Sequence, residues 1–275
     1  MVLPAPHARF LEEVPPRIER DDRIVGVAAA GSIANGRPDE YSDVDLVLAV
    51  EDDRFDSVLP ERIDLIRSWT PLVAAFTGEH VGEPRLVITL VGPPLLHVDF
   101  KFVSVRDFGA RVDDLRVLWE REGRLSAILA EQPPSPPRLD LQWIEDRFWV
   151  WVHYGAAKIA RGELFEAVGF LAFLRETVLG PLIHQRKGLL LQGVRRLEAL
   201  DPERAEAVRA TVCGYDRAEA GKALLAFVEL YQRWSAESGL PFERNHDAQA
   251  SAVEFLAGVV RSTRPRAGED EEPGS

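Results

Sequence analysis

The chain has 275 residues, 46% of them hydrophobic and 28% charged, which is an ordinary globular composition. Its formal net charge of −12 argues against extended nucleic acid binding and a template-directed polymerase, because both need a basic surface. The single cysteine, Cys213, excludes an intrachain disulfide and a cysteine zinc site, and it favours a cytoplasmic location. We expect no secretory leader and no membrane partner, since no apolar run of the ~20 residues of a membrane helix was identified.

The first part of the chain alternates strand-like and helix-like segments. Apolar runs and turn residues predict strands over residues 23–31, 43–50, 84–91, 95–105 and 115–125. Helical patterns are expected over residues 55–76 and 107–115. Together these segments predict a small mixed-sheet domain over residues 1–130.

Residues 131–139 are expected to form a linker, because four prolines within residues 131–138 cannot continue a helix. Beyond it the pattern is helical throughout, and residues 140–262 predict an all-helical bundle. Helices are expected over residues 141–163, 164–179, 202–212, 216–238 and 244–262. The acidic tail, residues 263–275, is expected to be disordered. The predicted fold class is therefore α+β, a mixed-sheet domain followed by a helical domain.

Two carboxylates stand where an apolar strand begins. Side chains alternate along a strand, so Asp43 and Asp45 point to the same face, with Cα atoms about 6.6 Å apart. Val44, Leu46 and Leu48 fall on the opposite face. A like-charge pair in this setting is unfavourable without compensation, which a divalent cation would supply.

A third carboxylate, Asp99, lies on a later predicted strand. His97, Asp99 and Lys101 share one face of that strand, and Val98 and Phe100 share the other. If the two strands are neighbours, Asp43, Asp45 and Asp99 converge, and such hard oxygen ligands suit Mg²⁺. Lys101 is expected either to partner Asp99 or to contact a phosphate.

A Gly-Ser pair, Gly31 and Ser32, ends the strand that precedes the two aspartates. Glycine lets the backbone approach a ligand closely, and the turn exposes N–H groups and a hydroxyl. This composition is suited to holding a phosphate group.

The stretch GSIANGRPDEYSDVDLVL, with Ser42 before the first aspartate, resembles the signature of the nucleotidyltransferase superfamily named after DNA polymerase beta. The spacing resembles most the antibiotic nucleotidyltransferases of aminoglycoside type, which also place a helical domain after the catalytic one. The resemblance implies that residues 1–130 are the catalytic domain and residues 140–262 a substrate-binding domain.

The same resemblance implies the reaction. A hydroxyl of a small, aminoglycoside-like molecule would attack the α-phosphorus of ATP or another NTP. The acceptor would take AMP or another nucleoside monophosphate, and pyrophosphate would leave. Asp43 and Asp45 would hold two Mg²⁺ ions, and Asp99 would be either a third ligand or the general base. Gly31, Ser32, Ser42, Lys101 and, from the helical domain, Lys158 would contact the nucleotide. Glu145 or Asp146 would supply a catalytic base. Alternatively, these two acids only stabilise the N-terminus of their helix through its dipole.

Three alternatives stay open at this point. The acceptor can be a protein, as in antitoxin-like AMP-transferring relatives. The chain can also be a non-catalytic nucleotide-binding protein that kept the fold. Arg147 and His153 loosely match the Arg-x(4–6)-His pattern of the HEPN ribonucleases.

Overall fold

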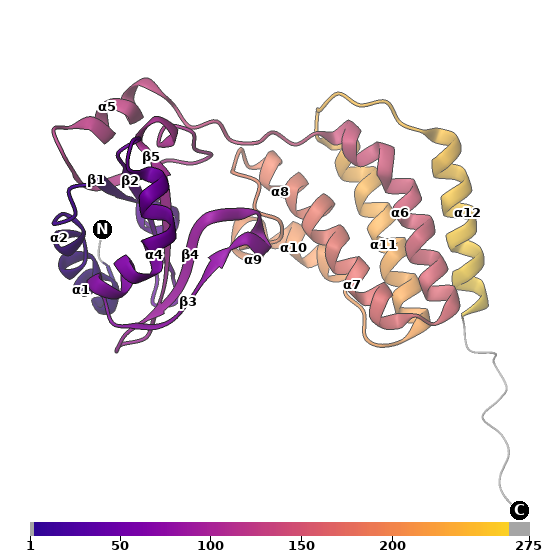
Figure 1. The fold of residues 1–275 in the computed structure, drawn as a ribbon. Helices are drawn as coiled ribbons and strands as arrows, with labels where there is room; N and C mark the ends of the chain where they lie inside the picture. Colours follow the sequence, from indigo (N-terminus) through magenta and orange to yellow (C-terminus); the bar gives the residue numbers. More distant parts are fainter. Residues whose placement is uncertain (1–2, 264–275) are drawn as a thin grey trace, which may run out of the picture. The chain divides into compact units, whose positions relative to one another are not determined.

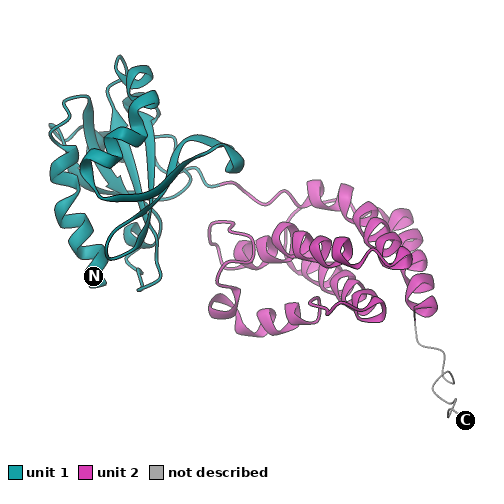
Figure 2. Cartoon of the chain, turned by 60° about the horizontal axis from the view of Figure 1, so that its bottom comes forward, with its two compact units in different colours: residues 1–136 teal, residues 137–275 magenta. Residues whose placement is uncertain are grey.

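The computed structural model describes residues 3–263. The chain divides into two compact units, with the boundary between Pro136 and Pro137, so that unit 1 precedes it and unit 2 follows it (Figure 2). No helix or strand is formed over residues 132–140, where the prolines are concentrated. The expected acidic tail lies, apart from Thr263, outside the described residues.

Unit 1 is built on a six-stranded mixed sheet in the order β3-β4-β5-β2-β1-β6. Its strands are β1 (Ile24–Ala29), β2 (Val44–Val50), β3 (Leu72–Gly78), β4 (Glu83–Val91), β5 (Leu96–Ser104) and β6 (Arg116–Glu120). All neighbouring pairs are antiparallel except β2 and β5, which are parallel. The expected mixed sheet is therefore confirmed.

One face of the sheet is covered by helices α1 (Ala5–Glu13), α2 (Pro15–Ile18) and α4 (Phe55–Trp69) (Figure 1). The strands bury alternate apolar side chains against them, among them Leu46, Leu48, Phe100 and Phe102. On the other face, helix α5 (Arg124–Glu131) packs over Ala28, Ala49 and Val103. Asp45 and Asp99 lie on that second face and belong to neither core, so the start of β2 is left open within unit 1.

Two segments of unit 1 differ from expectation. The helix expected over residues 55–76 ends at Trp69, because Pro71 forces Thr70 into an extended conformation, and the chain continues as β3. The helix expected over residues 107–115 is wrong. Only the single turn η2 (Val105–Asp107) forms there, and the loop is held instead by buried Phe108 and by Arg111, whose guanidinium donates to the carbonyl of Gln132.

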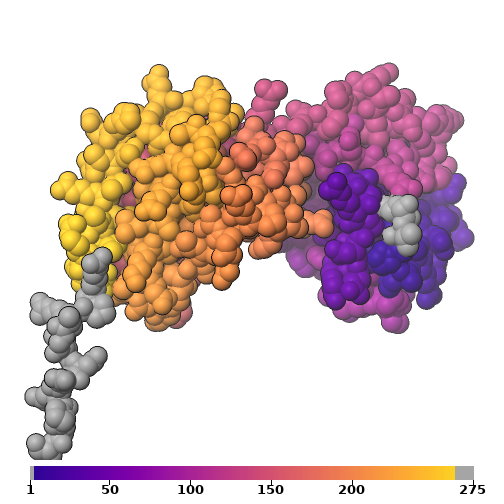
Figure 3. Space-filling view, turned by 180° about the vertical axis from the view of Figure 1, so that it is seen from behind, coloured from indigo at the N-terminus to yellow at the C-terminus, as the bar shows by residue number. Residues whose placement is uncertain are grey.

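Unit 2 is helical, as expected. Its elements are α6 (Leu141–Arg161), α7 (Leu164–Leu174), the π-helical turn Arg175–Leu179, α8 (Gly180–Arg186), α9 (Leu197–Leu200), α10 (Pro202–Arg209), α11 (Arg217–Glu237) and α12 (His246–Ser262). Helix α6 packs against both α11 and α12 (Figure 1). Seen from behind, α11 and α12 form a continuous orange to yellow surface (Figure 3). The residues Trp149, Val152, Ala156 and Ile159 are buried, which confirms that this stripe of α6 is core.

One helical run of unit 2, Leu164–Arg186, is long and apolar enough to cross a membrane by length and composition alone. This run differs from the expectation that no apolar run reaches the length of a membrane helix. More than half of its apolar window, 56%, is buried inside the structure, where Leu171, Leu174 and Ile183 belong to the core of unit 2. The apolar character of this run is accounted for by that core.

Candidate active site

The centre of the candidate site is the pairing of β2 with β5. In this parallel pair Asp45 is the direct partner of Asp99, with Val44 opposite Val98 and Leu46 opposite Phe100. Neighbouring strands lie about 4.8 Å apart, and paired residues point to the same face. The two carboxylates therefore emerge side by side, and Asp43, one residue before β2, points the same way.

The apolar neighbours dictate this orientation. Val44, Leu46, Val98 and Phe100 are all buried against the helix-covered face. Because a shift by one residue would move every side chain to the other face, the core locks the aspartates onto the open face.

Gly31 lies directly against the carboxylate of Asp45. It opens the single helical turn α3 (Gly31–Ala34) directly after β1, with a φ of +55°, in the left-handed region that favours glycine. A Cβ atom at this position would lie 2.3 Å from Oδ2 of Asp45. The N–H of Ala30 donates to the carbonyl of Asp45 at 2.9 Å, which fixes the turn against β2. A larger residue would be strained at this φ and would push the Asp45 carboxylate out of its position.

The two serines of the motif have different surroundings. The hydroxyl of Ser32 is buried and has no hydrogen-bond partner among residues 3–263, although buried polar groups are normally paired. Such an orphaned hydroxyl beside the Gly31 turn fits a phosphate oxygen. The hydroxyl of Ser42, in contrast, accepts from the N–H of Asp39 at 2.9 Å and donates to its carboxylate at 3.1 Å. Ser42 thus builds the turn before Asp43.

Asp99 has a partner on its own strand. Nε2 of His97 lies 3.0 Å from Oδ1 of Asp99. Burial raises the pKa of the Asp99 carboxyl, the nearby charge of Asp43 adds to this, and His97 opposes it. A carboxylate with a raised pKa accepts a proton more readily, which suits a general base.

The oxygen donors of the site are of the kind that Mg²⁺ prefers. Carboxylate oxygens of Asp43, Asp45 and Asp99 are the right kind of ligand, and the strand register brings two of them together. Within the described part of the chain, however, no group of three or more His, Cys, Asp or Glu side chains is gathered closely enough to hold a metal ion. One oxygen of Asp99 is engaged with His97. The pair Asp43 and Asp45 fits a cation arriving with its phosphate ligands, while Asp99 fits the role of base better.

The two predicted lysine contacts are engaged elsewhere. Nζ of Lys101 lies 2.8 Å from Oε2 of Glu83, so the strand-face partner of Asp99 is His97 and not Lys101. Lys158 belongs to α6 of unit 2, where its Nζ lies 2.6 Å from a carboxylate oxygen of Glu163. A phosphate contact by either lysine stays a prediction.

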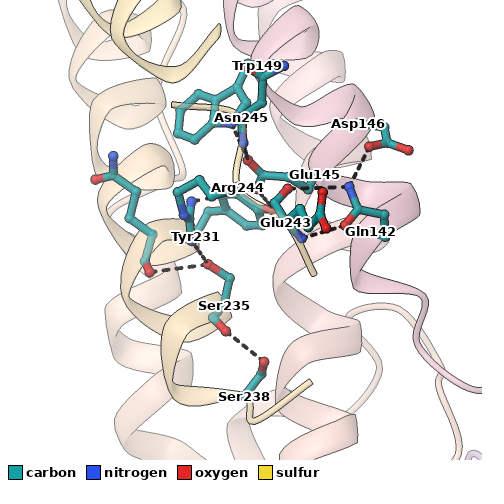
Figure 4. Close-up of polar contacts among 11 residues, drawn as sticks. Gln142, Glu145, Asp146, Trp149, Tyr231, Ser235, Ser238, Glu243, Arg244 and Asn245 are labelled. Atoms are coloured by element: carbon teal, nitrogen blue, oxygen red, sulfur yellow. Dashed lines mark hydrogen bonds and ion pairs between the residues drawn. The ribbon is translucent and has the colours of Figure 1, made fainter. Parts of the chain in front are cut away.

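Glu145 is a structural residue rather than a base. Its side chain is buried, with 1% of the residue exposed, and it accepts hydrogen bonds from Trp149 Nε1 at 2.7 Å, the hydroxyl of Tyr231 and the N–H of Asn245 at 3.1 Å (Figure 4). Arg244 lies 3.6 Å from its second oxygen. This network ties the loop after α11 to α6. The carboxylate has no exposed oxygen for a substrate.

Three further predicted residues of α6 also contact other side chains of unit 2. The exposed Asp146 accepts a hydrogen bond from the side chain of Gln142 at 2.7 Å. Arg147 stacks over the ring of Trp143, and the ring of His153 stacks on Phe255. Arg147 and His153 thus have separate aromatic partners within unit 2.

Two histidines were missed as site residues. His97 shares a face with Asp99 by strand alternation, and that pattern contained the signal for their contact. His7 on α1 is buried, and its Nε2 lies 2.7 Å from the carbonyl of Ser42, just before Asp43. No local pattern connects residues so distant in sequence.

Comparisons with known proteins give a loose likeness. No family model and no curated protein matches the chain. Among solved structures, an aminoglycoside 6-adenyltransferase from Bacillus subtilis is similar with a TM-score of 0.41 and 14% identity, over 90% of this chain and 97% of that one. A nucleotidyltransferase-like protein from Exiguobacterium sibiricum is similar with a TM-score of 0.37 and 12% identity, over 94% and 81%.

Proposed function

We propose that this protein is an Mg²⁺-dependent nucleotidyltransferase that moves a nucleoside monophosphate, AMP from ATP, to a hydroxyl of a small molecule. The observation that carries the proposal is the direct pairing of Asp45 with Asp99, with Gly31 folded closely over Asp45. A glycine turn that can expose N–H groups to a phosphate thus lies beside a carboxylate pair on one open sheet face.

The residues have distinct roles in this proposal. Asp43 and Asp45 hold the cation that accompanies the triphosphate, and Gly31 and Ser32 seat its terminal phosphates. When bound, Mg²⁺ neutralises charge on the phosphates and helps to align them. The chain's own contribution is positioning, because little covalent chemistry is required of the protein in phosphoryl transfer.

In the proposed step the acceptor oxygen forms a bond with the α-phosphorus. The bond from the α-phosphorus to the bridging oxygen breaks, and pyrophosphate leaves with that oxygen. The proton of the acceptor hydroxyl passes to the carboxylate of Asp99, whose raised pKa favours this role. His97 holds the other side of the carboxylate in place.

The acceptor we propose is a small, cationic, aminoglycoside-like compound. The net charge of −12 favours a positively charged partner over an anionic one. Lys158 and Lys101 are proposed as further phosphate contacts, which would require them to leave Glu163 and Glu83.

The test is transfer of label from α-labelled ATP to a panel of hydroxyl compounds. We expect Asp43→Asn and Asp45→Asn to lower transfer about a hundredfold or more, since each removes a carboxylate that would hold the cation of the triphosphate. Asp22→Asn, at an exposed turn of unit 1, is the matched control and should transfer as the wild type does. Intact transfer in the Asp43 and Asp45 variants would refute the proposal.

A further inference from the structure

A row of paired residues crosses the open face from the carboxylates to the sheet edge. Asp45 pairs with Asp99, Asp99 with Ile88 on β4, and Ile88 with Phe76 on β3. Directly paired residues point to the same face, so all four side chains lie on the open side of the sheet. At about 4.8 Å per strand, Phe76 lies roughly 10 Å from Asp99.

The far half of this row is apolar and accessible. Phe76 is 52% exposed and Leu90, which pairs with His97, is 37% exposed. Val87 and Thr89, on the opposite face of β4, are buried. The ring of Phe76 packs against the ring of His80, with centroids 5.5 Å apart, which holds the phenyl group in place. Phe76, Ile88 and Leu90 are referred to below as the apolar platform.

The geometry of the displacement gives the two ends of the row different roles. In an in-line displacement the incoming oxygen and the leaving group lie on opposite sides of the phosphorus. In the proposed function the leaving pyrophosphate is held by Gly31 and Ser32, which follow β1 and lie on the β1 side of Asp45. The acceptor therefore approaches from the Asp99 side, and the rest of its body extends over β4 and β3.

We propose that the apolar platform is the acceptor subsite, and that it takes a hydroxyl compound with a ring whose apolar face packs on Phe76. Sugars, cyclitols and aromatic alcohols have such a face. This inference rests on the proposed function and adds to it the residues of unit 1 that contact the acceptor. The nucleoside is attached to the α-phosphorus off the line of displacement, so the nucleobase is not the expected occupant.

The test uses α-labelled ATP with a panel of amino sugars, methyl glycosides, cyclitols and aromatic alcohols, and with glycerol as a ringless reference. We expect the wild type to label ring compounds better than glycerol. Phe76→Ala should raise the KM of the best ring compound about tenfold, as lost ring contacts imply, and should leave the affinity for Mg²⁺-ATP unchanged. Phe76→Trp, which keeps a ring, should restore the KM.

Val73→Ala is the matched control, because Val73 is 62% exposed on the same strand but falls at a register irregularity outside the row. It should leave the KM within twofold. An unchanged KM in Phe76→Ala would refute the acceptor subsite and leave the proposed nucleotidyltransferase function standing. A wild type that labels glycerol better than ring compounds would have the same meaning. Weaker binding of ATP, but not of tripolyphosphate, by Phe76→Ala would assign the platform to the nucleobase and also overturn it. A wild type that transfers to nothing refutes the proposed function, and the subsite with it.

Discussion

Asp45 of β2 and Asp99 of β5 are direct partners in the only parallel strand pair of the described sheet. Their neighbours on both strands are buried apolar residues, so the two carboxylates are held on the open face by the core beneath them. Two like charges on neighbouring strands lower stability unless something compensates them. This pairing is typical of a binding site rather than of a structural strand pair.

The first prediction concerns Gly31. Gly31→Ala should weaken Mg²⁺-ATP binding, measured by calorimetry, because the added Cβ would lie 2.3 Å from Oδ2 of Asp45 and would displace that carboxylate. Gly36→Ala is the control, since Gly36 also has a positive φ, +68°, but no atom within 4 Å of an added Cβ. Both variants should lose about 1–3 kcal/mol of stability from backbone strain. Equal ATP affinity in the two variants would contradict the proposal that the close contact of Gly31 with Asp45 is needed for ATP binding.

Ser32 and Ser42 should respond in opposite ways to removal of the hydroxyl. Ser32→Ala removes an unpartnered buried group, so the free energy of unfolding should stay level or rise by about 1 kcal/mol. The same variant should raise the KM for ATP about tenfold through loss of a charge-assisted hydrogen bond.

Ser42→Ala is the counterpart of that variant. It breaks two hydrogen bonds with Asp39 and should lower the free energy of unfolding by about 1 kcal/mol. Denaturant titration together with steady-state kinetics checks both serines. A Ser32→Ala protein that is less stable yet has an unchanged KM would show that Ser32 is structural.

Glu145 should matter for stability and not for transfer. Glu145→Gln leaves the largely buried guanidinium of Arg244 without its ionic partner, which should lower the free energy of unfolding by about 3 kcal/mol. Asp146→Asn, one residue along the same helix at an exposed position, should change it by no more than about 0.5 kcal/mol. Transfer by the folded Glu145→Gln protein should equal that of the wild type. Loss of transfer without loss of stability would restore Glu145 as a catalytic residue.

The ion pairs of Glu83 predict a pH dependence of stability. Arg85, and after it Lys101, hold the pKa of Glu83 at about 2, below its ordinary value of 4.5. Because the folded state lowers the pKa, the stabilisation is present above pH 4.5 and is lost as the pH falls towards 2.

Glu83→Gln should therefore lower the free energy of unfolding by about 1 kcal/mol at pH 7, and the difference from the wild type should shrink below pH 4.5. Denaturant titrations at several pH values measure it. Glu12→Gln, at an exposed position of α1, should show no such trend. A difference that persists unchanged to pH 3 would contradict the assignment.

Much of the site could be predicted from local patterns. Strand alternation placed Asp43, Asp45 and Asp99 on one face, and the Gly-Ser turn marked the end of β1, because both features depend only on neighbouring residues. The assignment of residues 71–76 to a helix failed, since a short apolar run does not distinguish a helix end from a strand.

The remaining parts depend on contacts between distant segments. The buried network of Glu145 joins residues of α6, α11 and the loop before α12. No pattern near Glu145 in the sequence predicts Tyr231 or Arg244 as its partners. The same holds for His7 and the carbonyl of Ser42. The order of the strands, which makes Phe76 part of the same row as Asp45, is likewise a property of the whole sheet.

The parallel pairing of β2 with β5 also has a kinetic consequence. Between these strands the chain forms α4 and the hairpin of β3 and β4, so Asp45 leaves the ribosome well before Asp99 does. Contacts between residues so far apart in sequence form slowly, because a long loop must close before they stabilise anything. We therefore expect nucleotide binding to be among the last properties to return on refolding, later than the helical signal of unit 2. A nascent chain halted before β5 would contain the Gly31 turn and Asp45 but would lack Asp99.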